Sequence, residues 1–453
     1  MRECRPPESQ EEDPTVRPSI ADVHQATATA PLSVAPNAVP GFRSFGFFVG
    51  LFLASSVALS CNYLGFVWTE IKLFRYAILA CTSVLALRHL RHTRLSSQGV
   101  AWLVSALYAL GTVVYTSDVP ATVLRGSSFM ALTTGAFLGG FICYRQSAPM
   151  IDRLPGRIAG LLAVLAIPSL VGLVLGTPGD FYAKGLFRGL FCHPNTLGAF
   201  ATLWLVVGLG VYDSQSLRYR RIALTGLVAM AVILLASKSR AGLAGTLVAT
   251  VSYFLTTRRV GRLLFIGASL GTIATAVFLV SPSVSDVATQ DTSAFLFKGG
   301  ADDVLLSRRE EWDTGWENFL ASPFFGYGFG TTPGFDTGEW KIVDLSGREK
   351  CNFVIAALEE TGVFGFPVMM LPVLLCIAQG FRLKRLNFRL IGFPGNSRSD
   401  ARLAAAFWAG AMGGIVDNLA EYTLWSPGSP MGGMLLFLAG AAEGLMLRTE
   451  DRE

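Results

Sequence analysis

Residues 352–378 read NFVIAALEETGVFGFPVMMLPVLLCIA, an apolar run that carries charge only at Glu359 and Glu360. Such runs recur along the chain, and about 20 apolar residues of helix are needed to cross a bilayer. Charged residues make up 15% of the sequence, against about 25% in an average soluble domain, and the mean hydropathy is +0.48. The short alternating segments typical of a membrane barrel are not seen. The sequence therefore predicts an all-α polytopic membrane protein.

Twelve apolar runs are candidate membrane spans, and we expect them to form a single transmembrane domain over residues 41–453. The seventh and eighth spans are the least distinct, because only Ser237-Lys238-Ser239-Arg240 separates them. The predicted spans are residues 45–62, 71–87, 99–116, 126–143, 157–175, 195–212, 222–236, 240–256, 262–281, 352–378, 403–419 and 431–447.

Residues 1–40 differ from the rest of the chain, because they are rich in Glu, Asp, Pro, Ser, Ala and Thr. A segment of this composition cannot bury enough apolar surface to form a core. It also lacks the basic and then apolar order of a signal peptide. We therefore expect residues 1–40 to be a disordered N-terminal tail.

Basic residues gather in every second loop between the predicted spans, and the intervening short loops carry two at most. Cytoplasmic loops of membrane proteins carry this excess of Lys and Arg, which predicts that both termini are cytoplasmic. The net charge of +5 follows from these loops and does not indicate nucleic acid binding. The basic loops are residues 88–94, 145–157, 218–221, 258–262 and 382–402.

One large polar segment, residues 281–351, falls between the ninth and tenth predicted spans and on the outward side. Loops of this length in a compact domain are usually functional. Charges near bilayer depth cost about 2.5–3.5 kcal/mol each, so such groups usually face a cavity or one another. The other outward positions with polar or charged groups are Arg125, residues 187–195, Lys238, Arg240 and residues 417–421.

Four outward segments carry short motifs. Residues 189–198 read GLFCHPNTLG, residues 237–242 read SKSRAG, and residues 308–330 have Arg308 and Trp312 before a glycine-rich stretch. The fourth motif is residues 352–365. These segments resemble the G-x-F-x-H-P-N-x-x-G segment, the S-x-S-R-x-G turn, the R-x-x-x-W…P-x-x-G-x-G-x-G loop and the segment after this loop in the O-antigen ligase and polymerase family. Each motif is short, but their order, spacing and shared outward side make a chance agreement improbable.

This resemblance implies a GT-C-like membrane glycosyltransferase with one large extracytoplasmic loop. The implied donor is a polyprenyl-pyrophosphate-linked glycan, the implied acceptor is a glycan or a lipid-linked glycan, and membrane lipid surrounds the protein. The implied reaction is inverting, metal-independent and free of cofactors. It takes place on the outer face of the cytoplasmic (inner) membrane in O-antigen, lipopolysaccharide or exopolysaccharide synthesis. A chain-length regulator or export proteins are the further partners that the resemblance suggests.

Transfer from such a donor breaks a sugar C1–O bond, and the departing pyrophosphate must be stabilised by a metal or by fixed cations. The outward acids are scattered and lack the spacing of metal ligands. We therefore expect Arg240 and one of Arg308 and Arg309 to act in catalysis, and Arg188 to bind substrate, because a guanidinium binds phosphate oxygens in pairs. The alternatives are interfacial positions for Arg240 and Arg188, and loop charges paired with neighbouring glutamates.

The acceptor hydroxyl benefits from a general base, and the family commonly has a histidine where this chain has Cys351. A thiol is a poor substitute for an imidazole with a pKa near 6.5. The candidate bases are then His193, Glu359 and Glu360, and catalysis without a base is a further alternative. The other readings are packing of the glutamates against an arginine, and helix capping or packing by His193.

The remaining positions in the family-like motifs are expected to bind substrate. The three glycines of the segment PFFGYGFG (residues 323–330) more readily allow a tight turn than cradle a phosphate. The expected substrate-binding residues besides Arg188 are Asn195, Lys238, Trp312, Tyr327 and Asn352.

Two outward pairs of residues suggest contacts between segments. Asp417 and Glu421 are an i, i+4 acidic pair and are candidates for an acceptor-sugar contact. Cys192 and Cys351 both lie beside motifs in an oxidising compartment, and a disulfide between them would tie the long loop to the segment that carries His193.

Two other classes of function compete with a glycosyltransferase. A polytopic transporter of a small anion or glycan would bind near the membrane midplane, with internal repeats and broken spans, whereas the charges here gather at the outer ends. An inactive relative would account for the missing histidine. Ligase and polymerase differ only in the acceptor, and the missing histidine slightly favours a polymerase or a divergent exopolysaccharide enzyme.

Overall fold

The structure is a computed structural model. It describes residues 42–452 except 62–67, 92, 147–159, 162–163, 176–180, 184–185, 215–216, 262–305, 332, 334–349, 351, 392–395, 422 and 427–428. The chain divides into two compact units, Met1–Arg43 and Ser44–Glu453, and the fold and the site concern the second unit. The predicted disordered tail, the ninth predicted span and Cys351 lie outside the described residues.

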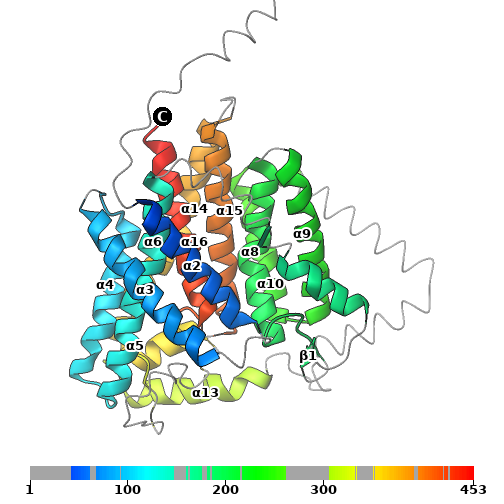
Figure 1. Cartoon of the computed structure of the whole chain (residues 1–453). Coiled ribbons are helices and arrows are strands. Elements are labelled where there is room, and N and C mark those ends of the chain that lie inside the picture. Colours follow the sequence, from blue (N-terminus) through cyan, green and yellow to red (C-terminus); the bar gives the residue numbers. More distant parts are fainter. Residues whose placement is uncertain are drawn as a thin grey trace, which may run out of the picture. The chain divides into compact units, whose positions relative to one another are not determined.

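The described part of the chain is mostly helical (Figure 1). A short hairpin pairs β1 (Tyr182–Ala183) with β2 (Leu186–Phe187), and a π-helical turn (Thr133–Phe137) joins α5 to α6. The helices are α2 (Phe42–Ser60), α3 (Trp68–Leu90), α4 (Ser97–Gly111), α5 (Val119–Leu132), α6 (Leu138–Gln146), α8 (Pro194–Ser214), α9 (Leu217–Ser237), α10 (Arg240–Thr256), α13 (Leu306–Ala321), α14 (Phe353–Arg389), α15 (Asn396–Asp417) and α16 (Pro430–Glu450).

Six helical segments of the described residues are long and apolar enough to cross a membrane. Shorter apolar helices cover Phe45–Ser60 and Val164–Val174. These findings agree with an all-α polytopic membrane protein, and the total of twelve spans stays a prediction. The six segments are Ser97–Val114, Val119–Gln146, Pro194–Asp213, Arg220–Ser237, Phe353–Arg389 and Pro430–Glu450.

Polar residues next to the apolar runs determine where several helices begin. Ser96, Asp118 and Ser239 each accept a hydrogen bond from a backbone N–H in the first turn of α4, α5 and α10. The Asn352 side chain does the same for α14, at 2.8 Å from Val354 N and 3.2 Å from Ile355 N. Such caps satisfy backbone donors that have no partner within the helix.

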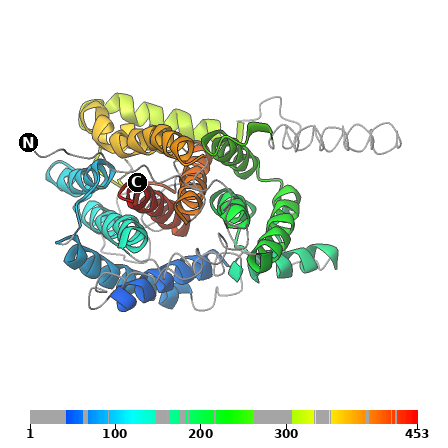
Figure 2. The same ribbon diagram turned by 90° about the horizontal axis from the view of Figure 1, so that it is seen from above.

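Helix α15 is a central element, since it packs against α8, α10, α14 and α16. Figure 2 shows α16 lying between α6 and α15. Small residues bring these helices close together: a Cβ atom on Gly413 would lie 2.7 Å from Ala249 Cβ, and one on Gly210 would collide with Ala406. Close approach through small residues is how membrane helices gain packing energy.

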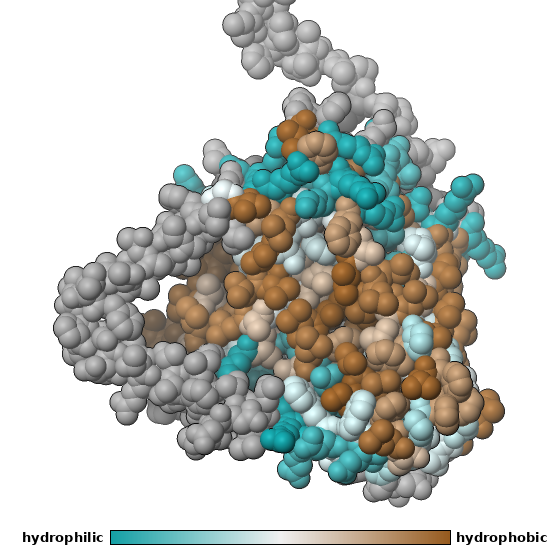
Figure 3. All heavy atoms as spheres, turned by 180° about the vertical axis from the view of Figure 1, so that it is seen from behind, coloured by the Kyte–Doolittle hydropathy of each residue, from teal (hydrophilic) through white to brown (hydrophobic). Residues whose placement is uncertain are grey.

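The two ends of the helices differ in their polar contacts. At one end, arginines of the predicted cytoplasmic loops meet acids near the C-terminus, with Arg382 at 2.9 Å from Glu450 and Arg145 at 3.4 Å from Asp451. At the other end, α13 runs across the bundle and packs against α14 (Figure 1); we call this the α13 end. Figure 3 shows the apolar band between two hydrophilic ends.

Candidate functional site

The helix α14 is broken near the α13 end, because Gly362 lies outside the helical region at φ 60° and ψ −172°. The break exposes the carbonyl oxygens of Glu359 and Glu360. The segment PFFGYGFG (residues 323–330), which we call the glycine-rich segment, caps these carbonyl oxygens. Tyr327 N lies 3.1 Å from Glu359 O, and Gly328 N lies 2.9 Å from Glu360 O. The motif therefore closes a broken helix with its own backbone donors.

The three motif glycines are needed for this close approach. Gly326, Gly328 and Gly330 have φ values of 69°, 101° and 76°, a region that side chains other than hydrogen disfavour. A Cβ atom on Gly328 would collide with Thr116 Oγ1, and one on Gly330 with the side chain of Arg125. These contacts favour the tight-turn interpretation of the motif over a phosphate cradle.

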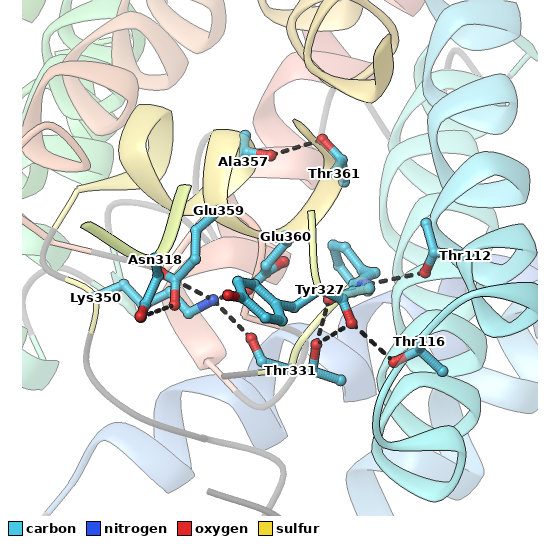
Figure 4. A network of polar contacts seen from close by, with 12 residues as sticks. Thr112, Thr116, Asn318, Tyr327, Thr331, Lys350, Ala357, Glu359, Glu360 and Thr361 are labelled. Atoms are coloured by element: carbon cyan, nitrogen blue, oxygen red, sulfur yellow. Dashed lines mark hydrogen bonds and ion pairs between the residues drawn. The ribbon is translucent and has the colours of Figure 1, made fainter. Parts of the chain in front are cut away.

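Glu359 and Glu360 point into a buried network around Lys350 (Figure 4). Lys350 Nζ lies 2.7 Å from Glu360 Oε1 and 3.4 Å from Glu359 Oε2, and it donates to Thr331 O at 3.0 Å. Asn318 Nδ2 of α13 donates to Glu359 Oε1 at 2.9 Å. This Lys350 network joins α13, Thr331 directly after the glycine-rich segment, and α14. Both glutamates therefore stabilise the contact between these elements.

A second cluster at the α13 end joins three segments that are far apart in sequence. Arg308 Nη2 lies 2.7 Å from Glu421 Oε1, and Asn195 Nδ2 donates to the same oxygen at 2.8 Å. Its side chains are only partly buried, with 21% of Arg308 and 19% of Glu421 exposed. We call Asn195, Arg308 and Glu421 the Glu421 cluster.

Arg308 and Arg309 have different environments. Arg309 forms an i, i+4 ion pair with Asp313 at 3.7 Å, and both side chains are 67% exposed. An exposed pair of this kind contributes little to stability. Of the two arginines, the structure brings Arg308 to the Glu421 cluster.

The turn after α15 carries Glu421 and is fixed by Asn418. Asn418 Oδ1 accepts hydrogen bonds from Thr423 N at 2.8 Å and Leu424 N at 2.7 Å. Its backbone oxygen accepts from Phe353 N at 3.2 Å, which places this turn beside the start of α14. Asp417, the last residue of α15, is 2% exposed.

The first two family-like motifs meet where α8 and α10 begin. A Cβ atom on Gly198 would collide with Ser239 Oγ, and Thr202 Oγ1 donates to Gly242 O at 2.9 Å. Arg240, in the first turn of α10, therefore starts a helix that is packed against the first turns of α8. Asn195 lies in the first turn of that same α8.

The loop before α8 is tied to the end of α2. Cys192 N donates to Ser60 O at 2.9 Å, and Cys61 forms an isolated β-bridge with Phe191. In the same loop Arg188 Nη1 donates to Cys192 O at 3.2 Å. Cys192 is a free cysteine in the structure, so the suggested disulfide with Cys351, which lies outside the described residues, is not formed.

The other predicted site residues are spread over the α13 end. The exposed His193 accepts a hydrogen bond from Asn195 N at 3.2 Å on its Nδ1 atom. Lys238 is exposed in the turn between α9 and α10, with φ 52°, and Trp312 is half-buried on α13. Tyr327 and Asn352 have the capping roles described above. Among the described residues, no group of three or more metal-binding side chains is found.

Sequence reasoning did not select Lys350 and placed Glu421 only as a sugar contact. One signal for Lys350 was the pair Glu359 and Glu360, because charges in an apolar run are costly and usually pair with an opposite charge. The signal for Glu421 was its i, i+4 spacing from Asp417. Neither signal identifies a partner that is distant in sequence.

The helical fold and the hydrophobic band define a polytopic membrane protein. Comparison with protein families adds that residues 225–370 match the model of the O-antigen ligase family. The matched range includes Arg240, Arg308, the glycine-rich segment and the broken part of α14, and it confirms the resemblance to this family. The first motif, residues 189–198, lies outside the matched range. At family level this match supports a membrane glycosyltransferase of the O-antigen ligase or polymerase type. No curated protein matches the chain.

Proposed function

We propose that this protein is a membrane glycosyltransferase that transfers or polymerises polyprenyl-pyrophosphate-linked glycans on the outer face of the cytoplasmic membrane. The observation that carries the proposal is the Glu421 cluster, where Asn195 of the first motif meets Arg308 of the third across one carboxylate. The second motif begins α10, which packs on α8 beside them. Three motifs therefore converge at one end of the bundle.

The proposed chemistry needs cations more than any other group. As the sugar C1–O bond breaks, charge grows on the pyrophosphate, and fixed guanidinium groups stabilise it with paired hydrogen bonds. Arg308 and Arg240 are the proposed clamp, since one lies in the cluster and the other begins the adjoining helix. The proposed reaction inverts C1 and uses no metal. Arg188, Lys238 and Trp312 are proposed to bind the donor around this clamp.

The broken helix α14 resembles a feature of transporters, whose binding sites use interrupted spans. Here the break at Gly362 is closed by the glycine-rich segment, and Val363 N also donates to Pro323 O at 2.8 Å. Backbone groups that satisfy one another leave little to coordinate a transported solute. This capping favours the glycosyltransferase over the transporter.

A pair of variants of the adjacent arginines tests the proposal. The full-length protein in lipid nanodiscs is given lipid-linked glycan extracted from membranes of a strain that lacks the chain, and the products are followed by chain length and by release of polyprenyl pyrophosphate. Arg308→Lys is expected to lower the rate about tenfold to a hundredfold, because Lys loses the paired geometry and such hydrogen bonds are worth about 1.5–3 kcal/mol each. Arg309→Lys is the matched control and should keep the full rate.

The same assay with a chelator checks the metal-independent reaction, which should proceed unchanged. A normal rate in Arg308→Lys and in Arg240→Ala, at equal protein level, would reject the clamp. Release of intact lipid-linked glycan to the other side of the nanodisc membrane or of a vesicle, without new glycosidic bonds, would favour a transporter instead.

A further inference from the structure

Asp417 is a buried acid beside a second acid, and the fold gives it little compensation. It is 2% exposed and interacts electrostatically with both Glu421 and Arg308. No hydrogen bond to its carboxylate comes from the described residues. Burying a carboxylate next to another one costs free energy, and arrangements of this kind gather at functional sites.

The acidic pair of Asp417 and Glu421 lies near the position where the resemblance predicts a general base. The family-like pattern has a histidine at the position of Cys351, just before α14. Phe353, two residues later, donates its N–H to the backbone oxygen of Asn418 at 3.2 Å, and Asn418 follows Asp417 directly. The turn with Asp417 and Glu421 therefore lies beside the start of α14, where the resemblance places the base.

The other acidic candidates are engaged differently. Glu359 and Glu360 are 0% and 1% exposed and share the Lys350 ammonium. Glu421 is 19% exposed, so it is the acid that a substrate reaches first. An ionised carboxylate with an exposed side can contact a sugar hydroxyl without unpacking the fold.

We infer that Glu421 is the general base of the proposed transfer. The inference rests on the proposed function. In the step, the acceptor O–H bond breaks and its proton passes to Glu421, while the oxygen forms a bond to C1 of the donor sugar. The C1–O bond to pyrophosphate breaks, and its electron pair leaves with the pyrophosphate, which Arg308 and Arg240 hold. The proton on Glu421 then returns to water.

The charged groups around Glu421 link its strength as a base to the binding of the donor. Arg308 from α13 favours the charged carboxylate of Glu421 and so makes it a weaker base, and the buried Asp417 from α15 interacts electrostatically with both. Asn195 from α8 donates a neutral hydrogen bond, and Arg240 begins the neighbouring α10. When a pyrophosphate occupies Arg308, the attraction of this guanidinium is shared between the pyrophosphate and Glu421, so Glu421 becomes a stronger base. The base then becomes effective when the donor is bound.

The test uses the nanodisc assay with two variants over a range of pH. Glu421→Gln should lower kcat about 10²–10⁴-fold with little change in KM for the donor, and the loss of rate toward low pH should disappear. Glu317→Gln, an exposed acid of α13, is the matched control and should leave the profile unchanged.

A second variant separates a base from a structural role. Glu421→Ala should regain part of its rate when formate is added, because formate replaces the missing carboxylate, and Arg308→Ala should not respond to formate. One outcome would reject the base assignment alone: an active wild type, an impaired Arg308→Lys, and a Glu421→Gln variant with a normal rate and pH profile. In that case the proposed glycosyltransferase function would still hold. A folded Glu421→Ala that is inactive and insensitive to formate would likewise overturn it. If the unmodified chain consumes no donor, the proposed function fails, and the base assignment fails with it.

Discussion

Two clusters at the α13 end combine carboxylates with a cation, but they differ in how much of their charged side chains is exposed. In the Lys350 network the three charged side chains are at most 3% exposed, and the ammonium group contacts both carboxylates and the Thr331 carbonyl oxygen. In the Glu421 cluster about one fifth of each charged side chain is exposed, and the partners come from α8, α13 and the turn after α15. Because the Lys350 network is buried, we expect it to stabilise the fold. Because the Glu421 cluster is partly exposed, its side chains can contact a substrate.

The largest expected effect is on the closed cluster. Lys350→Met leaves two buried carboxylates without their ammonium group, and breaking a buried ion pair from one side costs about 3–5 kcal/mol. The unfolding temperature in detergent should fall strongly. Lys384→Met, at an exposed lysine of α14, is the matched control and should leave it unchanged.

Neutralising the acids sharpens this expectation. Glu359→Gln and Glu360→Gln added to Lys350→Met should recover part of the lost stability, because no charge then remains buried. If Lys350→Met is as stable as Lys384→Met, the network is not a structural element and the contrast between the two clusters disappears.

The next effect concerns the segment that caps the broken helix. Gly328→Ala places a methyl group against Thr116 at φ 101°, and a strained backbone of this kind costs about 1–3 kcal/mol. Gly50→Ala, in α2 with nothing within 4 Å of a Cβ atom, should be neutral or slightly stabilising. Thermal unfolding of the two variants compares them directly. Equal stability would mean that the glycine-rich segment does not pack on α14 as described.

These two regions also show what the sequence can reveal. The apolar run at 352–378 predicted the helix, and Asn352 is a recognisable cap at its start. The break at Gly362 depends on the backbone of residues 323–328, a contact between segments that hydrophobic periodicity does not encode. In the same way, two glutamates in an apolar run indicate that a cation lies nearby, but only the folded structure shows that this cation is Lys350.

The Glu421 cluster was only half predictable. Arg308 and Asn195 came from motifs, and Asp417 and Glu421 were noticed through their spacing. Their meeting needs the fold, because Arg308 and Glu421 are 113 residues apart. The choice between Arg308 and Arg309 required knowing which face of α13 packs inward.

Two amide side chains offer a smaller and more pointed comparison. Asn195 donates to Glu421 at 2.8 Å, and Asn318 donates to Glu359 at 2.9 Å. A hydrogen bond to a charged group is worth about 1.5–3 kcal/mol, with less expected in the partly exposed cluster. Asn195→Ala should lower the transfer rate roughly tenfold and leave the unfolding temperature nearly unchanged. Asn318→Ala should lower the unfolding temperature and leave the rate per folded molecule unchanged. Reversed outcomes would exchange the roles of the two clusters.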